Sequence, residues 1–314
     1  MAINIVCSTD NRFAPYCGVM LTSLFENNRK SKLSVYVLVD ELFSKCNRQK
    51  YLQLGKKYNQ NLHIVTVDKN LTEDFPINHS FYRITLPTYY RLMASRLLPD
   101  EVSKAIYLDG DLIVTGSLES MWAIDLEGKA IAGVRDAWMT FENNSFDHLE
   151  YDREQGYFNA GVVILNLDYW RQHHTESQLI DFIQKRHNNL PYMDQDVLNG
   201  VLHNNKVWLP ERYNLMTKNL MKAYWVDFPD HYHNTLMEEL RQVVIVHYCG
   251  KIKPWHYRYD GGPFHKEWEH YRRLSPYKHC RIRKPVIKYL KRRVKDLLFP
   301  TKWQKRIAAT WISM

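Results

Sequence analysis

Short apolar runs rich in β-forming residues alternate along this chain with longer stretches of helical spacing, and this alternation limits the fold more than any other feature. The pattern predicts strands over 3–7, 33–39 and 62–67 and helices over about 16–26 and 43–58. Strands that alternate with helices in this way build βαβ units around a parallel sheet. The sequence therefore predicts an α/β fold with a doubly wound, largely parallel sheet.

The alternation continues into the second half of the chain. Leu86, Tyr90, Met93 and Leu97 recur at helical spacing and lead into a short strand over 105–108. Further strands are predicted over 130–134, 162–167 and 243–246, with helices near 176–187 and 196–203. In open α/β sheets ligands bind in the crevice at the carboxyl ends of the strands. Polar residues that directly follow these strands are therefore the first candidates for a functional site.

Two carboxylates one residue apart follow the predicted strand over 105–108, in the segment Asp109-Gly110-Asp111. The intervening glycine permits a tight turn or the close approach of a ligand. Mg²⁺ and Mn²⁺ prefer oxygen ligands, and one or two carboxylates combined with phosphate oxygens complete their coordination shell. The segment indicates a site for a divalent cation. The alternative is a solvated turn, since Asp and Gly are common turn residues.

A second polar segment, from His247 to His256, follows the predicted strand over 243–246 and is expected at a carboxyl edge as well. A neutral imidazole at His247 can add a nitrogen ligand to a pair of acids. A nearby lysine or the glycine backbone of the same segment can hold a diphosphate. The alternative is a polar loop stiffened by proline and tryptophan.

Two further segments have structural interpretations that compete with functional ones. The segment 194–196, Asp-Gln-Asp, opens a predicted helix, where acids suit the positive end of the helix dipole and Asp is a good cap. The segment 158–161, Phe-Asn-Ala-Gly, precedes the predicted strand over 162–167 and is compatible with a plain turn.

The net charge of +9 is concentrated near the end of the sequence. From Arg272 onward 14 Lys and Arg residues accompany one acid, Asp296, whereas the preceding residues hold 29 Lys and Arg against 33 Asp and Glu. No apolar run approaches the ~18 residues that span a bilayer, and the first residues lack the pattern of a signal peptide. Five cysteines without CxxC spacing favour a reducing compartment. We therefore expect a cytoplasmic protein.

Several common catalytic motifs are absent from the sequence. It contains no GxGxxG after the first predicted strand, no GxxxxGK[ST], no GxSxG and no HExxH. Dinucleotide-dependent redox chemistry, P-loop ATPase chemistry, the α/β-hydrolase elbow and zincin proteolysis therefore lack their usual sequence support. The paired acids leave open a metal-dependent nucleotidyltransferase, and the basic end leaves open a non-enzymatic protein that binds RNA or a membrane.

Taken in order, six segments resemble glycosyltransferase family 8, the retaining nucleotide-sugar transferases, and especially the bacterial lipooligosaccharide galactosyltransferases. The resemblance covers about residues 3–260 and is far more specific than any one segment. It is carried by Ser8-Thr9-Asp10 after the first strand, Thr88-Tyr89-Tyr90-Arg91-Leu92, Tyr107-Leu108-Asp109-Gly110-Asp111, Tyr157-Phe158-Asn159-Ala160-Gly161, Asp194-Gln195-Asp196-Val197-Leu198-Asn199-Gly200 and the segment from His247 to His256.

The resemblance implies a GT-A type, Rossmann-like nucleotide-sugar-binding fold, a UDP-sugar donor and a Mn²⁺ ion, with Mg²⁺ as the other candidate cation. By motif position the metal ligands are Asp109, Asp111 and His247, and the catalytic residues are Arg91, Asp194 and Gln195. In the same way Asp10 contacts uracil and Phe13 takes the base-stacking position usually held by Tyr. The full implied donor site is Ser8, Asp10, Phe13, Arg91, Asp109, Gly110, Asp111, Asn159, Ala160, Asp194, Gln195, His247, Gly250 and Lys253.

The resemblance also implies the reaction. A hexose, galactose first and glucose next, passes from UDP-galactose or UDP-glucose to a saccharide or lipid-linked acceptor in the synthesis of lipopolysaccharide or another cell-surface glycan. Gln195 faces the anomeric carbon in the family, and its amide is a poor nucleophile, so we favour same-face substitution over a glycosyl-enzyme. The sequence departs from the family pattern in two places: the family's Asp-Asp-Asn-Tyr opening is here Asp-Asn-Arg-Phe over 10–13, and Arg83 stands near the acceptor where the galactosyltransferase has His.

We expect two regions, a GT-A catalytic domain over 1–271 and a basic amphipathic tail over 272–314. In the tail, apolar residues recur at helical spacing from Val286 to Leu298, while most lysines and arginines take other directions. Aromatic residues beyond Pro300 suit a headgroup interface. The tail predicts peripheral attachment to the anionic inner face of the cytoplasmic membrane and no nucleic-acid partner. The alternative is a helix that packs its apolar stripe on the protein itself.

Overall fold

Strands and helices alternate along the chain as the sequence predicts. The computed structural model describes residues 2–72, 75–76, 85–141, 146–186, 189–220, 228–250, 252–256, 259 and 262–279. Its strands are β1 (Ile3–Thr9), β2 (Leu33–Val39), β3 (Asn61–Thr66), β4 (Lys104–Leu108), β5 (Leu112–Val114), β6 (Ile131–Arg135), β7 (Phe158–Asn166), β8 (Lys206–Trp208), β9 (Leu215–Met216) and β10 (Ile245–His247). Its α-helices are α1 (Ala14–Asn27), α2 (Lys45–Lys57), α3 (Ala94–Leu97), α4 (Glu119–Trp122), α5 (Ala137–Phe141), α6 (Leu167–Gln172), α7 (Thr175–Arg186), α8 (Asp194–Leu202), α10 (Asp230–Glu239) and α11 (His265–Leu274).

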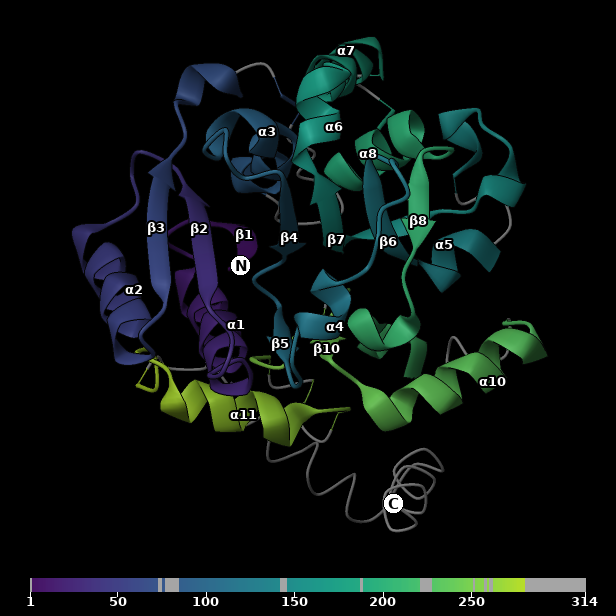
Figure 1. The fold of residues 1–314 in the computed structure, drawn as a ribbon. Helices are drawn as coiled ribbons and strands as arrows, with labels where there is room; N and C mark the ends of the chain where they lie inside the picture. Colours follow the sequence, from purple (N-terminus) through teal and green to yellow (C-terminus); the bar gives the residue numbers. More distant parts are fainter. Residues whose placement is uncertain are drawn as a thin grey trace.

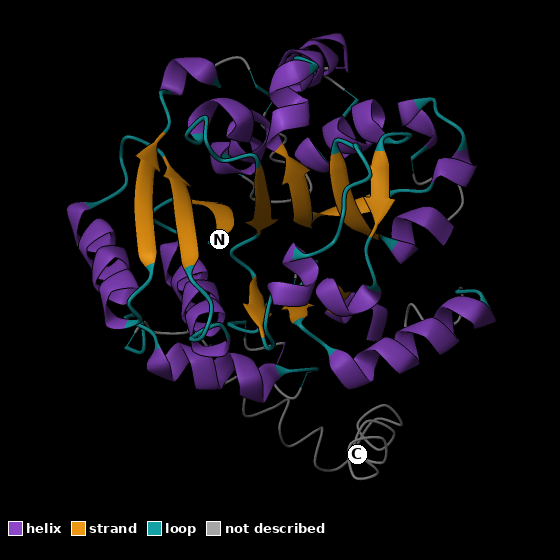
Figure 2. Ribbon diagram, viewed as in Figure 1, coloured by secondary structure: helices purple, strands orange, loops and turns teal. Residues whose placement is uncertain are grey.

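The central sheet has the strand order β3-β2-β1-β4-β7-β6-β8, with helices around it (Figures 1 and 2). Strands β1 to β4 are parallel, which confirms the predicted α/β architecture. Strand β7 is antiparallel to both of its neighbours, β4 and β6, so the sheet is mixed. This reversal brings the beginning of β7 beside the carboxyl end of β4, where Leu108 pairs with Val162.

Two local predictions need correction. The segment 158–161 is the first part of β7 and not a turn before it; Phe158 pairs with Arg135 of β6, and the carbonyl of Gly161 accepts from the Asp109 amide at 2.8 Å. Asn, Ala and Gly are poor strand formers, so the pattern marked only the apolar part of this strand. The predicted helix over 86–97 begins as a 3-10 helix, η2 (Leu86–Met93), and becomes α-helical only in α3.

A smaller sheet, in the order β5-β10-β9, lies against the end of β4. Strand β10 runs antiparallel to β5, and this register pairs His247 with Leu112. Because Leu112 directly follows Asp111, the pairing of β5 and β10 brings the histidine to the two acids. The smaller sheet therefore completes the site that the end of β4 begins.

Apolar side chains cover both faces of the central sheet, as expected for strands enclosed by helices. Helices α1 and α2 pack on one face through residues such as Leu21, Phe25 and Tyr51. Helices α6, α7 and α8 pack on the other through residues such as Trp170 and Leu198.

The predicted boundary between residues 271 and 272 falls inside α11. Beyond this helix, Tyr277 is buried in the same cluster as α1 and donates from its hydroxyl group to Asn47 of α2 at 2.9 Å. The packing of the body thus extends at least to Tyr277. The predicted amphipathic tail helix over 286–298 lies outside the described residues. Among the helices of the described ranges, none combines the length and apolar character needed to span a membrane.

Candidate active site

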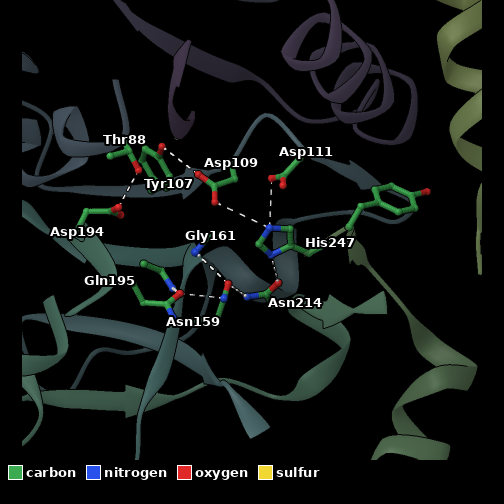
Figure 3. Close-up of polar contacts among 12 residues, drawn as sticks. Thr88, Tyr107, Asp109, Asp111, Asn159, Gly161, Asp194, Gln195, Asn214 and His247 are labelled. Atoms are coloured by element: carbon green, nitrogen blue, oxygen red, sulfur yellow. Dashed lines mark hydrogen bonds and ion pairs between the residues drawn. The ribbon is translucent and has the colours of Figure 1, made fainter. Parts of the chain in front are cut away.

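Three potential metal ligands meet where β4 ends, between the two sheets (Figure 3). One ligand atom from each of Asp109, Asp111 and His247 lies within 4.8 Å of the others. Nε2 of His247 is 3.2 Å from Oδ1 of Asp111 and 3.9 Å from Oδ2 of Asp109. The three residues that the sequence assigned to a cation are therefore brought together.

The space around this cluster fits a cation. A Cβ atom added at Gly161 would lie 2.7 Å from Oδ2 of Asp109 and would clash with the His247 ring, so only glycine allows the three ligands to meet. Two carboxylates and one imidazole are a suitable donor set for Mn²⁺. Burial lowers the pKa of His247, but Cys249 and Asp111 outweigh this and raise the pKa to about 10. A cation bound at Nε2 would take the place of the proton that this raised pKa holds there.

A chain of buried amide groups fixes the histidine ring. Nδ1 of His247 lies 3.0 Å from Oδ1 of Asn214, and the Asn214 amide donates to Oδ1 of Asn159 at 2.9 Å. Asn159 in turn donates to Asp136 at 3.3 Å, and the Lys218 ammonium lies 2.8 Å from the same carboxylate. This series of hydrogen bonds links the imidazole to the buried ion pair of Asp136 and Lys218, next to the end of β6.

Arg91 connects the acids of the metal cluster to α8. Its Nη2 donates to Oδ1 of Asp109 at 2.7 Å, and its Nε lies 2.9 Å from Oδ2 of Asp194. Nη1 donates to the carbonyl of Ala160 at 2.5 Å, and the guanidinium carbon lies 4.1 Å from the centre of the Tyr107 ring. Burial lowers the pKa of Arg91, but the charges of Asp109 and Asp194 outweigh it and hold the pKa above its ordinary value.

Asp194 and Gln195 open α8 and face the beginning of β7 (Figure 3). Oδ1 of Asp194 accepts from the Thr88 hydroxyl at 2.7 Å, while burial raises the pKa of Asp194 to about 6 against the opposing charge of Arg91. Oε1 of Gln195 accepts from the Asn159 side chain and from the Ala160 amide, both at 3.0 Å. Both side chains are therefore held in one orientation by their neighbours.

Lys253 contacts the cluster through Asp111. Its ammonium forms an ion pair with Asp111 and donates to the Tyr248 carbonyl at 2.8 Å. Burial raises the pKa of Asp111, but Lys253 and His247 outweigh it and hold the pKa well below its usual range. Gly250 has a φ of 87°, in the left-handed region that favours glycine, and leaves its backbone open to solvent.

The loop after β1 borders the segment that holds the two acids. Oδ1 of Asp10 accepts from the amides of Arg12 and Phe13 at 2.8 and 2.7 Å, which folds the loop back onto α1. Phe13 packs over Gly110, where an added Cβ atom would lie 3.0 Å from the ring. Ser8 shares a hydrogen bond of 2.8 Å with the Tyr107 hydroxyl.

Sequence reasoning missed three residues of this site, Asn214, Asp136 and Lys218, and also the role of Gly161. Asp136 directly follows β6, so the rule that ligands lie at carboxyl ends of strands could have found it. Asn214 precedes a strand of two residues and has no recognisable pattern.

Comparisons with known proteins identify the family and the fold that this chain resembles. The model of "Glycosyl transferase family 8" matches residues 4–258. The lipopolysaccharide 1,2-glucosyltransferase of Escherichia coli is 27% identical over 81% of this chain and 73% of its own length, and the lipopolysaccharide 1,3-galactosyltransferase of Salmonella typhimurium is 25% identical over 90% and 81%. The galactosyltransferase LgtC, solved with donor and acceptor sugar analogues, is 25% identical with a TM-score of 0.77, covering 87% of this chain and 96% of LgtC. The match to LgtC agrees with the expected GT-A type fold.

Proposed function

This chain belongs to glycosyl transferase family 8, and from that membership we propose that it is a retaining hexosyltransferase that uses a UDP-sugar. The observation that carries the proposal is the cluster of Asp109, Asp111 and His247 beside the Arg91–Asp194 ion pair. As a glycosyltransferase, the chain falls outside the two other classes that its sequence left open, the nucleotidyltransferases and the non-enzymatic binding proteins.

Asp109, Asp111 and His247 would hold the cation, Mn²⁺ or Mg²⁺, through two oxygens and one nitrogen. When bound, the cation would stabilise the negative charge that develops on the UDP leaving group. Lys253 contacts Asp111 of the cluster, and the exposed Gly250 lies three residues before it, so both would contact the diphosphate. The ammonium of Lys253 would add a charge-assisted hydrogen bond to that contact.

The sugar would lie between the metal cluster and α8. Arg91, Asn159, Ala160, Asp194 and Gln195 line this side and are all fixed by hydrogen bonds to one another or to Thr88. Thr88 and Arg91 occupy one oxygen each of the Asp194 carboxylate, and Gln195 offers only an amide. Neither is suited to form a covalent intermediate. This supports same-face substitution through an oxocarbenium-like state.

The nucleotide would lie along the loop after β1. Asp10 would contact uracil, Phe13 would stack on the base, and Ser8 would lie beneath the loop. Since Phe13 already packs over Gly110, the base and the metal acids would be neighbours. In a nucleoside diphosphate one ribose separates the base from the diphosphate, so a single molecule would reach both.

The acceptor would be a saccharide of lipopolysaccharide or of another lipid-linked glycan. The names of the two enterobacterial relatives support this class. The basic region over 272–314 would attach the enzyme to the inner face of the cytoplasmic membrane, where such an acceptor is presented.

A screen of UDP-sugars with Mn²⁺ tests the proposal. We expect slow metal-dependent hydrolysis of a UDP-hexose, with release of UDP. Release of pyrophosphate from a nucleoside triphosphate would instead indicate nucleotidyl transfer. Full activity after chelation would contradict the assignment of the metal site.

A further inference from the structure

The charged side chains of helix α2 are all positive, and the helix lies on the outside of the central sheet next to β3 (Figure 1). Its thirteen residues contain five basic side chains and no acid: Lys45, Arg48, Lys50, Lys56 and Lys57. Within the described ranges none of the five forms an ion pair with a carboxylate. Two of them interact electrostatically with nearby acids, Lys57 with Glu26 and Arg48 with Asp40. The exposed Lys45 and Lys56 remain available to a negatively charged partner.

Two apolar side chains next to these basic residues are exposed to solvent. Leu42, three residues before the helix, is 82% exposed, and Leu52 is 51% exposed; no other large apolar residue in the described ranges is as exposed as these two. Leu52 lines one shallow depression together with Lys45, Arg48 and Lys56. We call Leu42, Lys45, Arg48, Leu52 and Lys56 the basic α2 face. Apolar side chains among lysines and arginines are typical of segments that lie on an anionic membrane.

The basic α2 face is joined directly to the donor loop. Asn11, in the loop that holds Asp10 and Phe13, donates to the carbonyl of Leu42 at 2.6 Å. Its Oδ1 accepts from the amide of Ser44 at 2.8 Å and from the side chain of Asn47 at 3.1 Å. A surface that binds Leu42 would therefore lie at the rim of the candidate active site.

The basic α2 face is also continuous with the start of the basic region. Tyr277 donates to Asn47, and the Lys50 ammonium lies 4.7 Å from the centre of the Tyr277 ring. The chain therefore enters the basic region beside α2. Two positively charged segments that are far apart in the sequence begin at one place on the surface.

We propose that the basic α2 face binds the surface of an anionic phospholipid bilayer, as a contact separate from the C-terminal region. Its lysines and arginine meet the phospholipid headgroups, and Leu42 and Leu52 enter the boundary between headgroups and acyl chains. The contact brings the donor loop next to the membrane, which is where a lipid-linked acceptor is held. The membrane contact itself does not depend on the proposed sugar transfer.

Neutralisation of the exposed lysines tests the proposal in the full chain. We expect the double variant Lys45→Gln/Lys56→Gln to bind equimolar phosphatidylglycerol–phosphatidylcholine vesicles about thirty-fold more weakly than the native chain, from about 1 kcal/mol for each basic side chain. The matched control is Lys185→Gln/Arg241→Gln, which removes the same charge from exposed positions on α7 and after α10. It should bind the vesicles within about two-fold of the native chain.

Two further measurements complete the test. Leu52→Gln should weaken vesicle binding at high salt, where the electrostatic attraction between the helix and the headgroups is screened. Hydrolysis of the UDP-sugar should be unchanged in all these variants. If the native chain does not hydrolyse a UDP-sugar, the proposed function is contradicted, but the proposed membrane contact of the basic α2 face is not. Equal vesicle binding by the double variant and the control, or binding of single-stranded RNA in place of vesicles, would overturn the proposal.

Discussion

Asn214 accepts a hydrogen bond from Nδ1 of His247 at 3.0 Å, and this contact determines which ring nitrogen faces the acids. The NH₂ group of Asn214 is already committed, because it donates to Oδ1 of Asn159. Its carbonyl oxygen therefore faces the ring, and Nδ1 carries a proton. Nε2 is left 3.2 Å from Asp111, in position to bind a cation.

We expect Asn214→Ala to lower the affinity for Mn²⁺ about 10- to 100-fold, as is typical when the partner of a metal-binding histidine is removed. Activity should return at high Mn²⁺, because the three ligands remain. A Mn²⁺ titration of UDP-sugar hydrolysis measures this, with Asn234→Ala on the exposed surface of α10 as the control. An unchanged titration would show that Asn214 does not position the ring.

Asp109→Asn and Asp111→Asn should each lower sugar transfer by more than about a hundred-fold, since each removes a charged oxygen ligand worth several kcal/mol in the transition state. The fold should persist, because neither side chain belongs to the apolar core. His247→Ala should raise the Mn²⁺ concentration required. Turnover at the native rate in limiting Mn²⁺, with circular dichroism unchanged, would contradict the assigned ligands.

The buried carboxyl of Glu211 predicts a pH-dependent stability. Burial raises the pKa of Glu211 to about 8, although the Tyr232 hydroxyl donates to it at 3.1 Å. In the unfolded chain this group loses its proton near pH 4.5, so between the two values unfolding releases a proton. As the pH rises from roughly 4.5 to 8, Glu211 should therefore lower the free energy of unfolding by about 1.4 kcal/mol for each pH unit. Above pH 8 its contribution should stay constant.

Glu211→Gln should remove this slope and leave a chain that is more stable than the native one at pH 8. Urea unfolding over a pH series measures the difference, and Glu238→Gln on the exposed surface of α10 serves as the control. The same slope in the native chain and in Glu211→Gln would mean that Glu211 is ionised when folded.

UDP-galactose should be the preferred donor and UDP-glucose the second. The reason is the resemblance to galactosyltransferases together with Asp194 and Gln195 at the proposed sugar site. Comparison of kcat/KM for both donors at saturating Mn²⁺ decides the order. A preference for a GDP- or ADP-sugar would contradict the roles given to Asp10 and Phe13.

Removal of the basic region after His279 should weaken binding to anionic vesicles while UDP-sugar hydrolysis continues. The truncation is placed after His279 because Tyr277 packs against Gly18 and Tyr51, so a cut near residue 271 would damage the body. Vesicle co-sedimentation at low salt gives the measurement. Undiminished binding by the shortened chain would contradict a role for residues 280–314.

Much of the fold could be predicted because its evidence is local. The period of the apolar residues located β1, α1, β2 and α2 to within a few residues, since each element must bury one side or both. The acids after β4 and the histidine at the end of β10 follow apolar runs directly, so the rule for strand ends pointed to them. These features depend on neighbours in the sequence.

By itself the sequence determined the alternation of strands and helices, the candidate ligands Asp109, Asp111 and His247, and the concentration of positive charge toward its end. Only the tertiary structure decided the reversed direction of β7, the hydrogen bond from His247 to Asn214, and the need for glycine at position 161. The reason is physical: these features depend on which strands pair and in which direction, and that choice rests on contacts between residues far apart in the chain. No local period of side chains records such contacts.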